Sequence, residues 1–142
     1  MFEIARETLG VLHEGGALGV VVVTAVHGST PRAPGSAIAV CADGRAIGAV
    51  SGGCIESEAY ELALSRLADP EPVAETLGGQ GDLFRAGLAC GGTVDVIAFR
   101  LDPRDRGVVA ALEASLEDGE VALELPAPGG VRTLLRPRAP RM

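Results

Sequence analysis

The sequence feature that most constrains the fold is a run of apolar and mostly β-branched residues from Leu18 to Val26. A short apolar run of this kind is typical of a buried strand. Its purely apolar part, Val20 to Val23, is far too short to span a bilayer. The run therefore predicts a strand inside a globular domain.

A β-hairpin is predicted further along the chain. Asp43-Gly44 separates two apolar runs, Ala37–Cys41 and Arg45–Val50. An Asp-Gly pair between such runs favours a type I′ turn, in which both central residues need a positive φ. We therefore expect an antiparallel strand pair over these residues.

Hydrophobic periodicity predicts helices around these strands. Apolar residues recur at near-helical spacing over residues 2–13, and Gly15-Gly16 ends that segment. A second helix is expected from Ile55 to Leu67, with one apolar and one polar side, and a third over Arg106–Leu116. The remaining predicted elements are strands over Val73–Leu77 and Thr93–Phe99 and a second hairpin over Val121–Leu125 and Val131–Leu135.

Length and composition indicate one domain. The chain has 142 residues, of which 47% are hydrophobic but only 3% aromatic, so we expect a core of aliphatic side chains. Together with the element pattern, this predicts the α/β class with α+β character: a single domain over residues 1–135, in which helices pack on a mixed β-sheet. Residues 136–142 are expected to form a frayed C-terminal tail.

The charge balance argues against some partners. The acidic residues number 19 and the basic residues 12, which gives a net charge of −7, and every basic residue is an arginine. Nucleic acid is not an expected partner, because its recognition needs a basic face. An anionic ligand would need a local positive site made of a few arginines and oriented backbone amides.

The cysteines and the N-terminus indicate a cytoplasmic protein without a membrane partner. Cys41, Cys54 and Cys90 are odd in number and form no C-x-x-C pair, which argues against zinc-ribbon and thioredoxin-type sites. The first residues have neither the basic region nor the apolar run of a signal peptide. Reduced thiols in the cytoplasm fit this pattern best, and no metal site is predicted.

Candidate functional residues lie at three glycine-rich corners where apolar segments meet turns. The first is the segment from Gly28 to Gly35, in which two prolines restrict φ and the flanking glycines allow a positive φ. This pattern predicts a stiff, exposed loop that presents Ser29, Thr30 and Arg32. A rigid connection without a binding role explains the same pattern equally well.

The second corner, Ser51-Gly52-Gly53-Cys54, precedes the second predicted helix. The unpaired amides of a helix's first turn attract anions and lower the pKa of a nearby thiol, so Cys54 is a candidate thiolate. A small buried residue at a tight junction is the alternative, because free cysteines are often buried. Local reasoning leaves these two interpretations equal.

The third corner is Cys90-Gly91-Gly92, directly before the Thr93–Phe99 strand. Its glycines let a ligand or another backbone approach the sulfur closely, although a purely structural turn has the same pattern. Cys41, in contrast, lies in the middle of a predicted strand, where we expect it to fill the core.

Isolated polar residues give weaker indications. His13 and His27 have no carboxylate or cysteine at metal-ligand spacing, so we expect solvated or capped histidines. Asp95 interrupts an apolar strand, where a carboxylate must be hydrogen-bonded, for instance to orient a neighbouring loop, or must lie at an edge. No G-x-G-x-x-G fingerprint occurs, and a dinucleotide site is therefore not predicted.

Together, the three corners resemble the XdhC/CoxI family of xanthine dehydrogenase accessory proteins. The segment Gly28–Gly35 is similar to the family's G-S-[ST]-P-R-x-x-G loop. Gly48–Glu56 is similar to its G-x-[IV]-[SG]-G-G-x-[IVL]-E motif, and Cys90-Gly91-Gly92 matches its C-G-G element. The three motifs occur in the family's order over roughly residues 9–101.

The resemblance implies a non-catalytic role with molybdenum cofactor as a transient cargo. Family members bind and shield molybdopterin, assist its sulfuration together with a cysteine desulfurase, and deliver it to a xanthine-dehydrogenase-type molybdoenzyme. The family associates the C-G-G cysteine with cofactor binding, so this role carries over to Cys90. We extend the expected contacts to the neighbouring glycines and the other two corners: Gly91, Gly92, Ser51, Gly52, Gly53, Cys54, Ser29 and Arg32.

The chemistry of this cargo suits these residues. Molybdopterin carries a terminal phosphate, which backbone amides at a helix start together with Arg32, and also Arg85, would neutralise. A soft thiolate from Cys90 or Cys54 would suit the metal.

Two other functions stay open. A non-catalytic interaction module would pair with the target dehydrogenase or with a separate chain that supplies the Rossmann-like domain present in many family members. A sulfurtransferase would carry a persulfide on Cys54 or Cys90, but the sequence shows no acid–base partner for these thiols. The chain permits a homodimer without requiring one.

Overall fold

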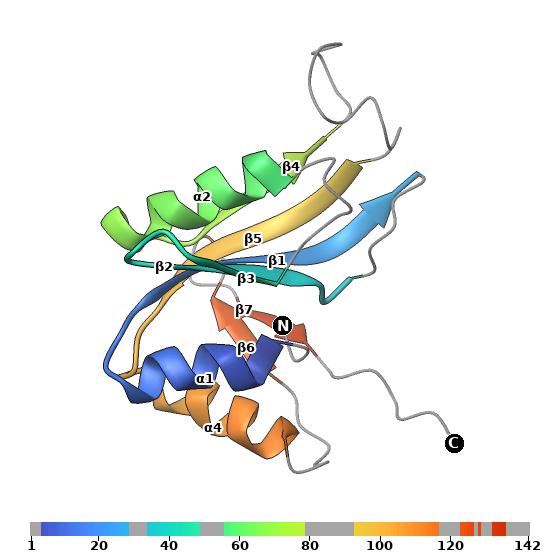
Figure 1. The fold of residues 1–142 in the computed structure, drawn as a ribbon. Coiled ribbons are helices and arrows are strands. Elements are labelled where there is room, and N and C mark those ends of the chain that lie inside the picture. Colours follow the sequence, from blue (N-terminus) through green and yellow to red (C-terminus); the bar gives the residue numbers. More distant parts are fainter. Residues whose placement is uncertain are drawn as a thin grey trace.

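The computed structural model describes residues 4–28, 34–48, 56–78, 93–116, 123–126, 128 and 132–135. Within these ranges one sheet has the strand order β3-β2-β1-β5-β4, and β6 and β7 form a separate hairpin (Figure 1). The elements in chain order are α1 (Ala5–His13), β1 (Leu18–His27), β2 (Ala37–Cys41), β3 (Ala46–Gly48), α2 (Glu56–Ala68), β4 (Val73–Leu77), β5 (Thr93–Leu101), α4 (Arg106–Ser115), β6 (Leu123–Pro126) and β7 (Arg132–Leu135).

The apolar run noted in the sequence forms β1, the middle strand of the sheet. β1 pairs with β2 on one side and with β5 on the other. Its residues from Leu18 to Val23 are all buried, because strands flank it and helices cover both of its faces. The prediction of a buried strand is confirmed.

Helix α2 covers one face of the sheet, whereas α1, α4 and the β6–β7 hairpin lie on the other (Figure 1). Successive residues of β1 therefore join different apolar clusters, as the pleat of a strand requires. The α2 side of the core includes Val21, Val23, Val40, Ala59, Ala63 and Val96. The opposite side includes Leu9, Leu18, Val20, Phe99, Leu112 and Leu125.

A β-bulge near the end of β1 changes the face that its last residues occupy. The register with β5 shifts between Val23 and Ala25, which leaves Thr24 as an extra residue. Such a bulge reverses the alternation of the side chains that follow it. As a result, His27 lies on the same face of the sheet as Asp95, and the two side chains meet.

The predicted hairpin forms between β2 and β3, but its turn has three residues, Ala42–Gly44. The Cys41 N–H donates to the Arg45 carbonyl at 2.8 Å, and the Gly44 N–H donates to the Cys41 carbonyl at 2.9 Å. Gly44 has a φ of 90°, as is typical of the last residue in a three-residue hairpin loop. The Tyr60 hydroxyl donates to the Gly44 carbonyl at 2.7 Å and thereby ties the turn to α2.

The expected class, with helices packed on a sheet, is confirmed, but the sheet is antiparallel rather than mixed. All of its described strand pairs are antiparallel. A parallel pair of neighbours needs a crossover connection between them, usually a helix. Helix α2 connects β3 and β4, which lie at opposite edges of the sheet, so this crossover produces no parallel pair.

The other predicted elements are present with shifted bounds. Helix α2 extends by one residue to Ala68, β5 continues to Leu101, and the second hairpin comprises β6 and β7. The tail at 136–142 lies outside the described residues, so the boundary after residue 135 stays a prediction. No helix in the described ranges is long and apolar enough to cross a membrane.

Candidate functional site

The residues predicted to contact a cofactor all fall outside the described part of the chain. They are Ser29, Arg32, Ser51, Gly52, Gly53, Cys54, Cys90, Gly91 and Gly92. The structure does describe residues that flank each of the three corners, and these flanks show where the corners attach to the sheet. The flanking residues are Gly28 and Pro34, Gly48 and Glu56, and Gly78 and Thr93.

The flanks of the three corners lie toward the same end of the sheet (Figure 1). Strands β1, β3 and β4 end there, and β2 and β5 begin there, because each pair of neighbours is antiparallel. Helix α2 also begins toward this end (Figure 1). The topology thus brings the flanks of corners that are far apart in the sequence toward one end of the sheet, which we call the loop-bearing end.

The strands do not all reach equally far at the loop-bearing end. The first residue of β2, Ala37, lies opposite Val22, and β1 continues for five residues beyond Val22 to His27. At a rise of about 3.3 Å per residue, β1 projects roughly 15 Å past the start of β2. β5 and β4 accompany this projection, since Thr93 lies opposite His27 and Leu77 lies opposite Val94.

The first corner has the backbone geometry expected at its two ends. Gly28 and Gly35 have φ values of 80° and 96°, as the sequence analysis predicted for the flanking glycines. The segment after the corner is hydrogen-bonded to Val23 of β1. The Val23 N–H donates to the Ser36 carbonyl at 2.8 Å, and the Val23 carbonyl accepts from the Gly35 N–H at 2.8 Å. The corner therefore starts and ends at fixed points of the sheet.

The second corner begins at Gly48, which another residue can replace only if neighbouring atoms move. Gly48 has a φ of 82°, and a Cβ at this position would lie 2.5 Å from the Ala37 carbonyl oxygen and 2.8 Å from the Ile4 Cγ2. On the far side of the corner, the first turn of α2 carries Glu56 and Glu58. These carboxylates stabilise the N-terminus of the helix, and they repel a further anion beside them.

A polar cluster of described residues lies on the projecting part of the sheet. His27 Nε2 lies 3.0 Å from Asp95 Oδ2, and the Thr76 hydroxyl donates to Asp95 Oδ1 at 2.8 Å. The Thr24 hydroxyl of the bulge donates to the Asp95 carbonyl at 3.1 Å. Asp95 on β5 is thus bound from both neighbouring strands.

The hydrogen bonds of Asp95 favour its ionised form. The bond with His27, and next the bond from Thr76, lower the pKa of the Asp95 carboxyl, and the small degree of burial opposes them. The carboxylate is therefore ionised at neutral pH and accepts a hydrogen from His27 Nε2. This leaves Nδ1 as the ring nitrogen that a neutral His27 can use as a proton acceptor.

The contact between His27 and Asp95 was not predicted from the sequence. A solvated or capped histidine was expected, because no carboxylate lies near His27 in the sequence; the two residues are 68 positions apart. Two signals were nevertheless present: Asp95 interrupts an apolar strand, and His27 ends another. Of the two alternatives left open for Asp95, a hydrogen-bonded carboxylate and a position at an edge, the structure shows the first, since β5 lies between β1 and β4.

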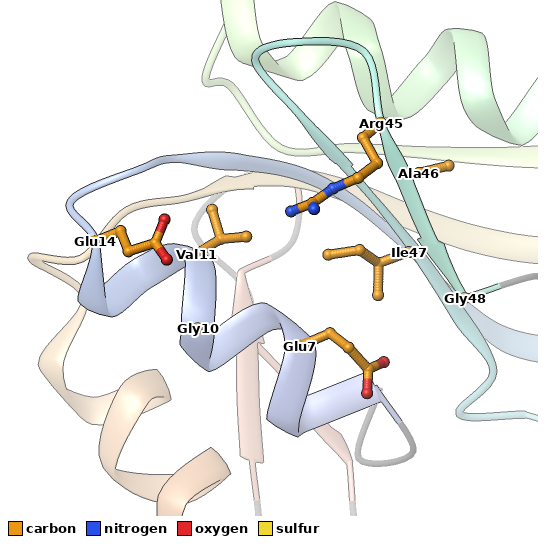
Figure 2. A pocket seen from close by; sticks show the side chains of 8 residues that line it. All are labelled: Glu7, Gly10, Val11, Glu14, Arg45, Ala46, Ile47 and Gly48. Atoms are coloured by element: carbon orange, nitrogen blue, oxygen red, sulfur yellow. The ribbon is translucent and has the colours of Figure 1, made fainter.

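The structure also has a shallow groove between α1 and β3, with a volume of about 580 Å³ (Figure 2). The Arg45 side chain extends over this groove toward α1 (Figure 2). Its guanidinium lies 3.7 Å from the buried Cys41 sulfur, and this contact raises the pKa of Arg45. Cys41 is buried, as expected. The groove is lined by Glu7, Gly10, Val11, Glu14, Arg45, Ala46, Ile47 and Gly48.

Within the described ranges, no group of three or more His, Cys, Asp or Glu side chains could hold a metal ion. The described polar groups at the loop-bearing end, a histidine paired with a carboxylate, suit hydrogen bonding and proton transfer instead.

The fold and this site define a class: a small α+β domain with an antiparallel sheet and a histidine–carboxylate pair. The pair lies on strands that flank two of the glycine corners. Residues 11–78 match the model of the XdhC and CoxI family, the family that the sequence motifs resemble. A search of curated proteins finds no match.

A solved structure shares the fold. It is described as a xanthine dehydrogenase from Bacillus halodurans, and it superposes with a TM-score of 0.63 at 21% sequence identity. The match covers 83% of this chain but 36% of the other, so this chain spans about a third of that protein. At this level of identity the likeness concerns the fold alone.

Proposed function

We propose that this chain takes part in the maturation of a xanthine-dehydrogenase-type molybdoenzyme, and that it does so as an accessory protein rather than as a catalyst. In this proposal it binds molybdenum cofactor transiently as cargo at the loop-bearing end. It assists the sulfuration of the cofactor together with a cysteine desulfurase and then delivers the cofactor to the enzyme.

The observation that carries this proposal is the family match over residues 11–78. The matched segment contains the first two glycine corners, with Ser29, Arg32 and Cys54. Cys90 lies beyond it, but the strand that follows Cys90 begins at Thr93, opposite His27 of the matched segment. A sheet that directs three separate corners to one end supports a shared binding site there.

Electrostatics favour Arg32, and also Arg85, as the expected phosphate contacts. The chain has a net charge of −7, so a phosphorylated cargo needs local positive charge. Arg66 donates to the Glu71 carbonyl at 2.6 Å, and Arg100 binds Asp102 and the Leu67 carbonyl. Both act at the opposite end of the sheet, where Arg100 pairs with Gly19.

Retention of cofactor by the purified protein tests the proposal. We expect pterin oxidation products to be released from freshly purified wild-type protein and detected by fluorescence. Cys90→Ala should lower their amount at least about tenfold, because a lost metal contact has effects of this size or larger. Cys41→Ala is the matched control, since Cys41 is buried on the sheet and should leave retention unchanged.

Three outcomes distinguish the candidate functions. Equal retention by wild type and Cys90→Ala would exclude Cys90 as a ligand. A cofactor-free protein that still binds the molybdoenzyme in a pull-down would instead identify an interaction module. Turnover of a protein-bound persulfide on added thiol would identify a sulfurtransferase.

A further inference from the structure

The outer backbone groups of the edge strand β3 have no strand beside them in the described part of the chain. β3 is the last strand of the sheet and pairs there with β2 alone. The Arg45 carbonyl points toward β2, because it accepts a hydrogen bond from the Cys41 N–H at 2.8 Å. The N–H of Ala46 belongs to the same trans peptide unit and therefore points away from β2. By the alternation of an antiparallel ladder, the N–H of Gly48 points outward as well.

Helix α1 forms the second wall of a groove along this edge (Figure 2). The groove has a volume of about 580 Å³, within the range of roughly 300–1,000 Å³ that is typical of ligand sites. Val11 and Ile47 supply its apolar surface. An exposed strand edge can bind an extended peptide as an additional strand: main-chain hydrogen bonds supply affinity, and neighbouring pockets select side chains.

Gly10 keeps the groove open on the side of the helix. It lies in the interior of α1, where glycine is less favourable than alanine. A Cβ at this position would have nothing within 4 Å, so no neighbouring atom requires the glycine. Its missing side chain instead leaves the space between α1 and Ile47 free for a side chain of a bound strand.

The charges of the groove favour a basic occupant. Glu7 and Glu14 lie on its helix side, two turns of α1 apart, and Arg45 lies on its strand side (Figure 2). Contact with Cys41, and more weakly the charge of Glu14, raise the pKa of Arg45, so the charge of Glu14 is partly balanced. Glu7 forms no ion pair with another described residue. A cationic side chain beside Glu7 would form a charge-assisted hydrogen bond.

We propose that the groove binds an extended peptide segment of another protein, which adds to β3 as a further strand and directs a basic side chain toward Glu7. The bound segment hydrogen-bonds to the outward N–H groups of Ala46 and Gly48. Its residue opposite Ile47 points, like Ile47, toward α1, where Gly10 leaves room for it. A basic residue two positions away lies on the same face of the added strand. The inference goes beyond the proposed function and does not depend on cofactor binding.

A second copy of this chain fits the edge less well. Antiparallel pairing of two β3 strands would place both copies of α1 on the same face of the combined sheet, because the two-fold axis is then perpendicular to the sheet. A second Glu7 and a second Glu14 would face the first pair across the groove, and like charges repel.

Selection of a phage-displayed library of random seven-residue peptides on the immobilised full chain tests the inference. We expect the enriched peptides to contain arginine or lysine among residues of high β-propensity. A synthetic, fluorescently labelled copy of an enriched peptide then gives a dissociation constant for each variant by fluorescence anisotropy.

Two substitutions test the groove and the strand edge separately. Gly10→Leu fills the groove and should weaken peptide binding about tenfold or more. Gly107→Leu is the matched control, because Gly107 is also a helical glycine with nothing within 4 Å of an added Cβ, but it does not line the groove. Ala46→Pro removes the outward N–H without removing a hydrogen bond to β2, and it should weaken binding roughly fivefold or more.

A third substitution tests the basic contact. Glu7→Gln should weaken binding roughly two- to fivefold, as expected for an exposed ion pair, and added NaCl should weaken wild-type binding in the same direction. Glu113→Gln removes an exposed glutamate of α4 outside the groove and should leave the affinity unchanged. Equal affinity of Glu7→Gln and wild type would exclude the basic contact.

The inference is overturned if no peptide is enriched, or if an enriched peptide binds Gly10→Leu and Ala46→Pro as tightly as wild type. A dimer of the purified chain that Gly10→Leu dissociates, seen by analytical ultracentrifugation, would identify a second copy as the occupant and would equally contradict it. Urea unfolding of each variant shows that lost binding does not come from loss of the fold.

Discussion

At the scale of single residues, Asp95 links the three strands that project at the loop-bearing end. Its carboxylate binds Thr76 of β4 and His27 of β1, and its carbonyl accepts from Thr24 of the bulge. Each contact is partly exposed, so we assign to Asp95 a small effect on stability and a larger effect on the orientation of His27.

The ionisation of Asp95 makes its contribution to stability pH-dependent. Because its folded-state pKa lies below the unfolded value of about 3.9, the stabilisation is present above that value and is lost as the pH falls through the folded pKa. Asp95→Asn should lower the free energy of unfolding by up to about 1 kcal/mol near neutral pH, a limit set by exposure. Urea unfolding should show a smaller difference between the two proteins near pH 2; an equal difference at both pH values would contradict this explanation.

At the scale of elements, the packing of α2 on the sheet depends on small residues. A Cβ added to Gly19 of β1 would lie 1.8 Å from the Ala63 carbonyl oxygen of α2. Ala59 and Ala63 are themselves fully buried against the sheet. The helix therefore approaches β1 more closely than any larger side chain at position 19 allows.

Gly19→Ala should force α2 away from the sheet. We expect the free energy of unfolding to fall by roughly 1–3 kcal/mol or more, because extra atoms in a well-packed core force side chains and backbone to shift. Gly10→Ala is the matched control, because nothing lies within 4 Å of the added Cβ and a glycine inside a helix costs about 0.5–1 kcal/mol relative to alanine. Urea unfolding should therefore show opposite shifts, and a Gly19→Ala protein as stable as wild type would rule out the close contact.

At the scale of the whole molecule, one sheet supplies both sides of the core. Leu18 of β1 is buried on the side of α1 and α4, whereas Val21 and Val23 of the same strand pack on the α2 side. Loss of packing on either side therefore weakens the same strand, and we expect the domain to unfold as one unit.

Tyr60 allows a test of this cooperativity, because it is the single tyrosine of a chain without tryptophan. Its fluorescence reports α2, whereas far-UV circular dichroism reports all elements. Leu18→Ala, on the opposite side of the sheet, should lower the free energy of unfolding by about 2–5 kcal/mol and shift both signals together. A Tyr60 transition at a lower urea concentration than the circular dichroism transition would indicate separate unfolding of α2.

The elements were largely predictable because they depend on local patterns. The β-branched run at 18–26, the Asp43-Gly44 turn and the apolar spacing of α2 each correspond to an observed element. The antiparallel character of the sheet was not predictable in this way, because it depends on which strands become neighbours. The three-residue turn differs from the expected one because the register between Cys41 and Arg45 decides the loop length.

By itself, the sequence determined the type and approximate bounds of the elements and the family motifs, because side-chain periodicity and glycine placement act over a few residues. Only the tertiary structure decided that the flanks of all three corners lie at one end of the sheet and that His27 meets Asp95. These relations join residues up to 68 positions apart. They arise from strand order and from a single bulge residue, Thr24, whose effect on side-chain direction appears only when β1 pairs with β5.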